Sequence, residues 1–212
     1  MSRNAKSGKR ALTSRGAATK GRIVEAAAEL IYAKGAERVS LDEVMEATGT
    51  SRSQLYHYFE NKDALVREVI EIQTSRILAA NSLHLESLDS FEALRVWRDW
   101  MIAANRAEGG VGGCPLGSLA NELAARSEEA RHQLDQSFAA WGAVIEMGLC
   151  RMRERGQIRI GADPKAMAVA VLAAIQGGIL LSKTARSSQP LELALDMALS
   201  HVERYAAELP AN

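Results

Sequence analysis

Apolar residues recur every three or four positions along almost the whole chain, and no long stretch alternates apolar and polar residues as a half-buried strand does. The first clear stripe lies between Ala17 and Lys34, with Glu25 and Glu29 largely on the opposite side. Its apolar members are Ile23, Ala26, Ala27, Leu30, Ile31 and Ala33. Spacing of this kind predicts an all-α protein with about nine helices.

Capping residues divide the following stretch into short helices. Ser40, with Glu43 three residues later, has the form of a capping box that starts a second helix. Gly49 ends that helix, and Ser51 caps a third one over residues 51–58. A fourth helix, begun by Asn61 or Asp63, is expected to run through residue 78. Further helices are expected over residues 89–107, 115–126, 128–155, 164–185 and 190–208.

Residues 40–58 have the spacing of a helix-turn-helix, in which the second helix protrudes and enters the major groove of DNA. Leu55 and Phe59, four residues apart, supply the apolar side that holds this helix in place. The residues expected to contact DNA are Ser40, Thr50, Arg52, Ser53, Gln54, Tyr56, His57 and Lys62. The spacing alone is also compatible with a short helical corner in an enzyme.

The residue types in this segment suit DNA recognition. Arg52 can bind guanine O6 and N7, and Gln54 can pair with the edge of an adenine. Tyr56, Lys62 and the hydroxyl of Ser40 suit phosphate oxygens. Phosphate contacts position a protein on the duplex, whereas base contacts give it specificity.

The same region resembles the N-terminal domain of TetR-family regulators over about 55 residues without a gap. The matching features are A-x-x-L in the first helix, the Gly35 stop, the Ser40 cap, the Gly49 turn, Tyr56-His57-Tyr58-Phe59 and Asn61-Lys62-Asp63-Ala64-Leu65. The resemblance implies a dimeric, ligand-responsive DNA-binding protein. It also implies that Tyr56 and Lys62 hold the phosphate backbone, while the bases or nearby phosphates are faced by Arg52, Ser53, Gln54 and His57.

The chain has no net charge, but its charge is unevenly distributed. Residues 1–22 contain seven Lys or Arg and no acidic residue, and residues 1–67 carry twelve basic against eight acidic residues, a net charge of +4. This asymmetry favours an anionic partner at the N-terminal end, although a solvated basic tail would look the same. We expect a basic disordered arm over residues 1–16, a DNA-binding domain over 17–65 and a helical ligand-binding and dimerisation domain over 66–212.

The three tryptophans of the chain all lie in the second of these domains. Aromatic and methionine side chains at helical spacing are usually core, but a mostly apolar cavity between bundle helices is also where small ligands bind. We expect such a cavity, lined by Trp97, Trp100, Met101, Cys114, Leu119, Trp141 and Ile145.

The segment around Cys114 resembles a G-C-P-x-G-x-L-A-x-E signature in a TetR subgroup of the LmrA/YxaF kind. Cys114 stands just before Pro115, at the start of a predicted helix, where the helix dipole favours a thiolate. Such a thiolate could sense an electrophile or an oxidant. The alternative, which we favour, is that Cys114 packs as a small hydrophobic residue.

The last two helices are expected to form a homodimer interface through Ala168, Val171, Leu172, Ile175, Gly178, Ile179, Leu191, Leu195, Leu199 and Val202. A dimer places two recognition helices roughly one DNA turn, about 34 Å, or a multiple of it apart, which predicts a near-palindromic operator in double-stranded DNA. A small-molecule effector that tilts one long helix would change this separation. The apolar run 166–181 is shorter than the about 20 residues that span a bilayer, so no membrane partner is expected.

No arrangement of residues favours an enzyme, a metal site or a cofactor. The four histidines are scattered, no HExxH or GK[ST] motif occurs, and neither cysteine belongs to a CxxC pair. No secretory signal is expected, and we predict a reducing, cytoplasmic location. A scaffold protein is the remaining rival, and it would lack sequence-specific, salt-dependent DNA binding. Repression is the commonest mode in the resembling family, while the inducer and target genes stay open.

Overall fold

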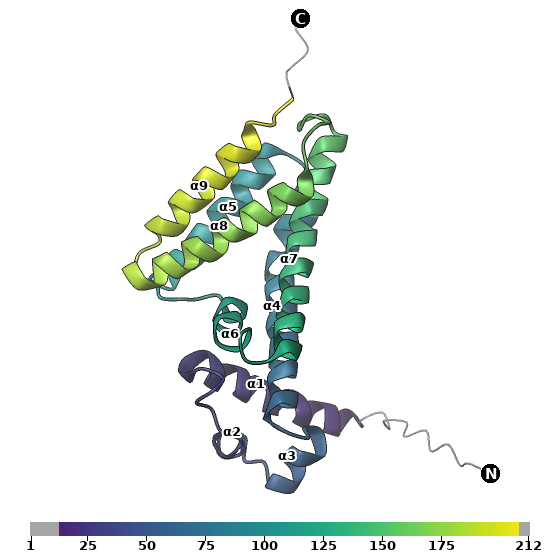
Figure 1. Ribbon diagram of the computed structural model, residues 1–212, viewed down its shortest axis with the longest axis vertical. Helices are drawn as coiled ribbons and strands as arrows, with labels where there is room; N and C mark the ends of the chain where they lie inside the picture. Colours follow the sequence, from purple (N-terminus) through teal and green to yellow (C-terminus); the bar gives the residue numbers. More distant parts are fainter. Residues whose placement is uncertain (1–12, 208–212) are drawn as a thin grey trace, which may run out of the picture. The chain divides into compact units, whose positions relative to one another are not determined.

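The structure is a computed structural model that describes residues 13–207, and over these residues it is all-helical, as predicted (Figure 1). The nine helices are α1 Ser14–Lys34, α2 Leu41–Thr48, α3 Arg52–Tyr58, α4 Lys62–Glu86, α5 Phe91–Ala107, α6 Pro115–Leu123, α7 Glu128–Glu154, α8 Pro164–Ala185 and α9 Gln189–Glu203. Their contacts divide the chain into two compact units, Met1–Val69 and Ile70–Asn212, with the boundary inside α4.

The first helix begins earlier than the sequence pattern indicates. The hydroxyl of Thr13 accepts a hydrogen bond from the backbone N–H of Gly16 at 3.2 Å, so Thr13 caps α1 and the helix starts at Ser14. Residues 14–16, which the sequence assigned to a disordered arm, are therefore helical. The remaining part of the predicted arm, residues 1–12, lies outside the described residues.

The buried stripe of α1 is turned relative to the predicted one. Its buried residues are Ile23, Val24, Ala27, Ala28 and Ile31. The predicted members Ala26, Leu30 and Ala33 are partly or fully exposed. Alanine fits either edge of an apolar stripe, so the packing of α1 against α2, and not the alanine pattern, determines which side is covered.

In the second unit, α4 and α7 run side by side in the same direction. Thr74 Oγ1 donates a hydrogen bond to Ser137 Oγ at 2.8 Å, and further along the two helices the Arg151 guanidinium binds the backbone oxygens of Leu85 and Leu88. The Thr74–Ser137 and Leu88–Arg151 contacts both join residues 63 positions apart, as parallel helices require. Arg151 thereby binds one carbonyl group in the last turn of α4 and one in the segment just after it.

The last two helices form an antiparallel pair with a close approach at Gly178. A Cβ atom placed on Gly178 would lie 2.9 Å from the Cα atom of Leu191, so a side chain does not fit there. Ser182 of α8 also accepts a hydrogen bond through its Oγ atom from the backbone N–H of Leu191, at 3.1 Å. The start of α9 is thus held firmly against the end of α8.

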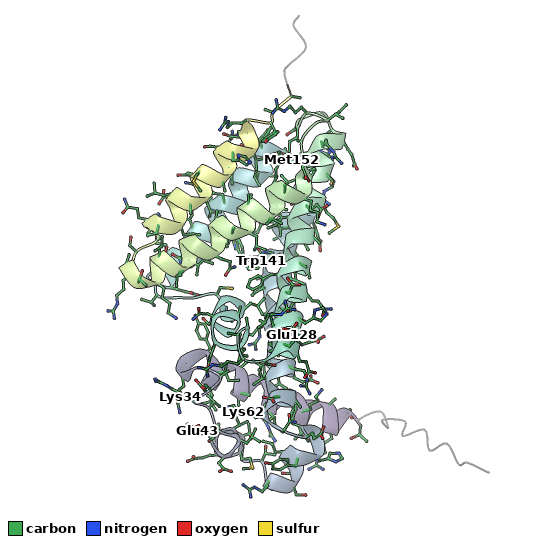
Figure 2. The ribbon with its side chains drawn as sticks, viewed as in Figure 1. Lys34, Glu43, Lys62, Glu128, Trp141 and Met152 are labelled. Atoms are coloured by element: carbon green, nitrogen blue, oxygen red, sulfur yellow. The ribbon has the colours of Figure 1, made fainter. Side chains whose placement is uncertain are left out.

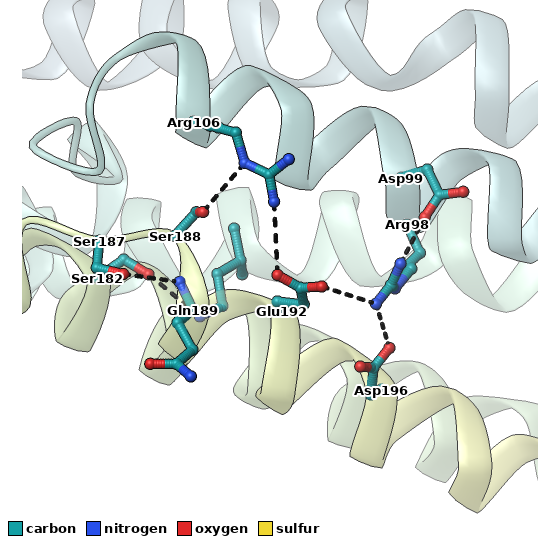
Figure 3. Close-up of polar contacts among 10 residues, drawn as sticks. Arg98, Asp99, Arg106, Ser182, Ser187, Ser188, Gln189, Glu192 and Asp196 are labelled. Atoms are coloured by element: carbon teal, nitrogen blue, oxygen red, sulfur yellow. Dashed lines mark hydrogen bonds and ion pairs between the residues drawn. The ribbon is translucent and has the colours of Figure 1, made fainter.

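Ion pairs join α5 to α9 (Figure 3). Arg98 Nη2 lies 2.5 Å from Asp196 Oδ1 and 3.8 Å from Glu192 Oε1. Arg106, two turns further along α5, places its Nη2 atom 3.6 Å from the other oxygen of Glu192. The hydrogen bonds that Arg98 donates to Asp99 and Asp196 raise the pKa of Arg98, against the opposing effect of its burial.

Two helices are shorter than predicted. α6 ends at Leu123 and α9 ends at Glu203, where the sequence pattern indicated 126 and 208. After α9 the chain pairs with the segment that follows α7: the N–H of Arg159 donates to the oxygen of Tyr205 at 2.9 Å, and the N–H of Ala207 donates to the oxygen of Gln157 at 2.8 Å. This isolated antiparallel bridge replaces the last helical turn.

Among the described residues, α8 is the one helix whose length and composition would suit a membrane span. It has 22 residues, a mean hydropathy of 1.7 in its most apolar window, and only 33% of that window buried inside the protein. The helix is longer than the apolar run noted in the sequence, because it includes the polar residues at both ends. α8 packs against α7 and α9, which leaves its outer side uncovered.

Candidate nucleic-acid interface and small-molecule cavity

The first unit contains the predicted helix-turn-helix. Gly49 adopts a left-handed conformation, with φ 63° and ψ 25°, and ends α2. Within three residues the chain turns and begins α3, whose Leu55 is fully buried together with Val44 of α2 and Phe59. The side of α3 that carries Leu55 is therefore buried, and the opposite side of α3 is exposed.

The capping box predicted at Ser40 is present. Ser40 Oγ accepts from the Glu43 N–H at 3.2 Å, while the Glu43 carboxylate accepts from the Ser40 N–H at 2.8 Å and from its hydroxyl at 3.0 Å. The Lys34 ammonium, 2.8 Å away, and these bonds from Ser40 lower the pKa of Glu43 to about 2 (Figure 2). The Ser40 hydroxyl, expected on a phosphate, thus has partners within the protein.

A second capping box occupies Gln54, which the sequence assigned to an adenine. Its carboxamide oxygen accepts from the N–H of Ser51 at 3.0 Å and from the Ser51 hydroxyl at 3.2 Å. Adenine is bound by a carboxamide through its oxygen and its nitrogen together. Gln54 therefore has to release its oxygen from the cap before it can pair with adenine in this way.

Four other predicted contacts lie on the exposed side of α3: Arg52, Ser53, Tyr56 and His57. The Arg52 side chain is 72% exposed, and its guanidinium lies 3.6 Å from the carboxylate of Asp42 on α2. An exposed pair at this distance contributes little, about 0–1 kcal/mol, so Arg52 can exchange it for another anion.

The last two predicted contacts are placed differently. Lys62, at the start of α4, donates from its ammonium to the backbone oxygen of Glu37 at 2.9 Å, and an ammonium keeps two further donors for a phosphate. Thr50 in the turn is only 6% exposed, and its hydroxyl oxygen is buried without a partner among the described residues. Thr50 is thus buried, unlike the other seven predicted contacts, which are exposed or half-exposed.

The second unit contains a cavity of about 310 Å³. Of the seven residues predicted for a pocket, four line it: Trp100, Met101, Cys114 and Trp141. The other three are buried elsewhere in the core: Trp97, Leu119 and Ile145. The sequence pattern indicated α5, α7 and the start of α6, but it did not distinguish the residues on the cavity wall from those packed behind it.

The contributions of α4, of the segment before α6, and of Ile179 on α8 and Leu191 on α9 were not predicted. The lining also includes Gln73, Arg76, Ile77, Ala80, Asn81, Ala104, Asn105, Glu108, Gly112, Gly113, Pro115, Ile179 and Leu191. Gln73 and Asn81 were the available signal, because they are polar residues on the buried side of α4. The amide of Asn81 accepts a hydrogen bond from Trp97 Nε1 at 3.0 Å, which explains why Trp97 is buried behind the wall.

Cys114 caps α6, and its sulfur accepts a hydrogen bond from the Gly117 N–H at 3.4 Å. Burial nevertheless raises the pKa of the Cys114 thiol, although the bond from Gly117 acts in the opposite direction. The loss of solvation thus outweighs the hydrogen bonds to the sulfur, and the balance favours the thiol over the thiolate. The buried neutral thiol agrees with Cys114 as a packing residue.

Eight of the ten predicted dimer residues of α8 and α9 are buried inside the unit, while Leu172 and Ile179 are half-buried. Ala168, Val171, Ile175 and Gly178 are buried, and so are Leu191, Leu195, Leu199 and Val202. A different set of apolar and small residues is exposed on the two helices: Val169, Ala173, Gly177, Leu180, Leu181, Leu193 and Met197. We call this set the outer face of α8–α9. The buried residues among those predicted for the interface thus pack within the unit itself.

Two family models match the chain. Residues 23–69 match the model described as bacterial regulatory proteins of the tetR family. Residues 90–197, about half of the chain, match the C-terminal domain of LmrA/YxaF-like transcriptional regulators. The matches cover the helix-turn-helix and most of the unit that contains the cavity.

Individual transcriptional regulators are also similar to the chain. The uncharacterized HTH-type transcriptional regulator YxaF of Bacillus subtilis is 29% identical over 186 residues, 86% of this chain and 93% of that protein. The HTH-type transcriptional repressor NemR of Escherichia coli is 26% identical over 197 residues, 89% of this chain and 94% of the repressor. A TetR-family regulator from Cytophaga hutchinsonii has the same fold, with a TM-score of 0.83 at 20% identity over 94% of this chain and all of that one. The relatives are transcriptional regulators and not enzymes.

Proposed function

The chain belongs to the TetR family of bacterial transcriptional regulators, in its LmrA/YxaF-like subgroup, and on that premise we propose that it is a cytoplasmic, dimeric repressor released from a palindromic operator by a small molecule. The observation that carries the proposal is the occurrence in one chain of an exposed recognition helix and of a mostly apolar cavity. NemR, a relative of nearly the same length, is named as a repressor, which supports this sign of regulation.

DNA recognition is assigned to the exposed side of α3. Arg52 and Gln54 would read base edges, with Ser53 and His57 beside them, because arginine and glutamine offer paired hydrogen bonds to guanine and adenine. Tyr56 and Lys62 would hold phosphates, and the start of α2 at Ser40 would add backbone N–H groups.

Dimerisation is assigned to the outer face of α8–α9. The five large side chains of this face are between 58% and 67% exposed, although they are Val, Leu and Met. Small residues, Ala173 and Gly177, lie between them on α8 and would let a partner helix approach closely. Two such helices from each subunit would form a four-helix interface.

Release from DNA is assigned to the cavity. Residues of α4 line it, and the same helix begins at Lys62 in the DNA-binding unit. A ligand that binds one arrangement of α4 more tightly than another would shift the population between them, and with it the spacing of the two recognition helices. A change of a few ångströms would prevent both helices from entering their grooves together.

The first test is selection of bound duplexes from a random pool with the purified protein, followed by a salt titration on the selected sequence. We expect a near-palindrome whose half-sites lie about one DNA turn, or a multiple of it, apart. Arg52→Ala should relax the base preference, whereas Tyr56→Phe should weaken binding to all sequences alike. Selection of no sequence, with weak binding to every duplex, would contradict the proposal.

The dimer is tested separately with Leu193→Glu and Met197→Glu on the outer face of α8–α9. Both variants should become monomers by analytical ultracentrifugation and lose cooperative operator binding. Leu83→Glu on α4 is the matched control, since Leu83 is 77% exposed but lies outside this face. Dimers that survive both outer-face substitutions would rule out this interface.

A further inference from the structure

Two residues that line the cavity each carry a buried hydrogen-bonding atom that has no partner among the described residues. The two atoms are Nε1 of Trp141 on α7 and Oδ1 of Asn105 on α5. Their residues are only 3% and 8% exposed. Buried polar atoms in folded proteins nearly always have a partner, so each exception requires an explanation. Figure 2 labels Trp141 on α7, the helix against which α6 packs.

The other buried tryptophan in this region shows that the chain can satisfy an indole by itself. Trp97 Nε1 donates to Asn81 Oδ1 at 3.0 Å, and Trp97 does not line the cavity. Trp141 lines the cavity and has no such partner. The difference between the two indoles therefore coincides with contact with the cavity.

The chemistry of the two atoms specifies what a bound molecule would offer. An indole N–H is a donor only, so Trp141 requires a hydrogen-bond acceptor. The carboxamide oxygen of Asn105 is an acceptor and requires a donor. A molecule that carries one of each would satisfy both atoms at once.

The rest of the lining limits the charge and size of that molecule. Ile77, Met101 and Leu191 contribute apolar surface, and the charged residues Arg76 and Glu108 have opposite signs. A net charge on the ligand would consequently find no matching excess in the wall. The volume of about 310 Å³ is at the lower end of small-molecule sites, which suits one or two rings.

We propose that the effector is a neutral one- or two-ring compound whose acceptor, such as a carbonyl oxygen, binds Trp141 Nε1 and whose donor, such as a hydroxyl, binds Asn105 Oδ1. This inference rests on the proposed function, in which the cavity is the effector site. It adds the identity of the two hydrogen bonds by which an effector is distinguished from other apolar molecules of the same size.

Four probes with one ring skeleton test the inference by isothermal titration calorimetry. They are 6-hydroxy-2-acetonaphthone with acceptor and donor, 2-acetonaphthone with the acceptor alone, 2-methylnaphthalene with neither, and the anion 2-naphthoate. We expect affinity to fall in that order among the three neutral probes, by about tenfold for each hydrogen bond lost. The anion should bind more weakly than 2-acetonaphthone.

Substitutions in the protein then assign each loss of affinity to one atom. Trp141→Phe keeps an aromatic ring but removes the N–H, so 2-acetonaphthone and 2-methylnaphthalene should bind it about equally. Asn105→Leu removes the amide, so the hydroxyl of the first probe should give no advantage. Trp97→Phe is the matched control: it breaks the bond to Asn81 and should lower stability, but it should preserve the order of the probes.

Equal affinities of the four probes for the wild-type protein would overturn the inference. The inference would also be overturned if both the Trp141→Phe and the Asn105→Leu variants bound the probes in the same order of affinity as the wild type. Binding of no probe by a protein that still binds its selected operator would also overturn it, while leaving the DNA-binding function in place. Loss of operator recognition itself would instead contradict the proposed function. The wild-type series decides the matter even if one variant fails to fold.

Discussion

Gln54 has two roles that compete for the same carboxamide oxygen. In the free protein this oxygen closes the capping box of α3 with Ser51, and in an adenine contact it would have to leave that box. Leaving a cap costs about 0.5–1 kcal/mol, which is small beside the gain of about 1–3 kcal/mol from a good bidentate base contact. Recognition of the correct base would therefore open the cap, whereas a wrong base would not.

Two substitutions separate these roles. Gln54→Glu preserves the capping box, because glutamate is also suited to this third helical position, but it presents a carboxylate to the DNA. We expect unchanged stability in urea unfolding and a strong loss of operator affinity. Gln54→Ala should lower stability by about 0.5–1 kcal/mol and reduce base preference. If Gln54→Glu bound the operator as the wild type does, Gln54 would have no part in recognition.

Glu43 makes the start of α2 sensitive to acid between about pH 4.5 and 2. Its folded-state pKa of about 2 is below the value of 4.5 for an unperturbed glutamate. The carboxylate bonds therefore stabilise the fold fully above pH 4.5, and this contribution disappears as the pH falls towards 2. Carboxyl ¹³C shifts measured against pH should show Glu43 titrating near 2.

The cause of the low pKa can be tested by removing the neighbouring cation. Lys34 is its largest cause, so Lys34→Met should raise the pKa of Glu43 towards 4.5. Lys62→Met is the control, because Lys62 binds the backbone oxygen of Glu37 instead. A pKa that stays near 2 in Lys34→Met would mean that the bonds from Ser40 suffice.

Contacts between residues that are close in the sequence were predictable, and contacts between distant residues were not. The Ser40–Glu43 box joins residues three apart, so its pattern is visible in the chain itself. The burial of Thr50 and the bond from Lys62 to the oxygen of Glu37, 25 residues away, depend on how the helices pack. Propensity and spacing carry no information about such contacts.

At the scale of elements, the α8–α9 pair depends on one glycine. A methyl group on Gly178 would lie 2.9 Å from both Cα and Cδ1 of Leu191 and 3.2 Å from Cβ of Ala194. Because the nearest atom belongs to the backbone, α9 would have to move. We expect Gly178→Ala to cost about 1–3 kcal/mol in the free energy of unfolding, measured by urea denaturation.

Gly21→Ala provides the matched control for this substitution. Gly21 also lies within a helix, but a Cβ atom there would meet nothing within 4 Å. Alanine should accordingly stabilise α1 by about 0.5–1 kcal/mol. Equal effects of the two substitutions would show that the close approach at Gly178 does not limit the packing of α9.

The elements themselves were largely predictable, but their orientation was not. Periodicity gave each of the nine helices because apolar spacing is a property of the sequence alone. It did not show which side of α8 and of α9 is buried, because apolar residues occupy both the inner and the outer side. Leu195 and Leu193 have the same hydropathy, and only the packed structure shows that the first is buried and the second exposed.

At the scale of the whole molecule, the positive charge is concentrated in the first residues of the chain. Residues 13–69 carry eight Lys or Arg against nine Asp or Glu, so the part of the DNA-binding unit that the structure describes has no basic excess. Residues 1–12 add Arg3, Lys6, Lys9 and Arg10 without an acid. General attraction to DNA would therefore come mainly from these four side chains, while α3 supplies specificity.

Deletion of residues 2–12 tests this division of labour. Each phosphate neutralised by a protein contributes about −0.9 to the slope of log K against log salt concentration, so loss of four contacts would reduce the slope by about 3–4 for each subunit. Affinity should fall by the same factor for the selected operator and for a scrambled duplex, because phosphate contacts carry no sequence information. An unchanged slope would show that the basic segment is only a solvated tail, and that α1 to α4 bind DNA without it.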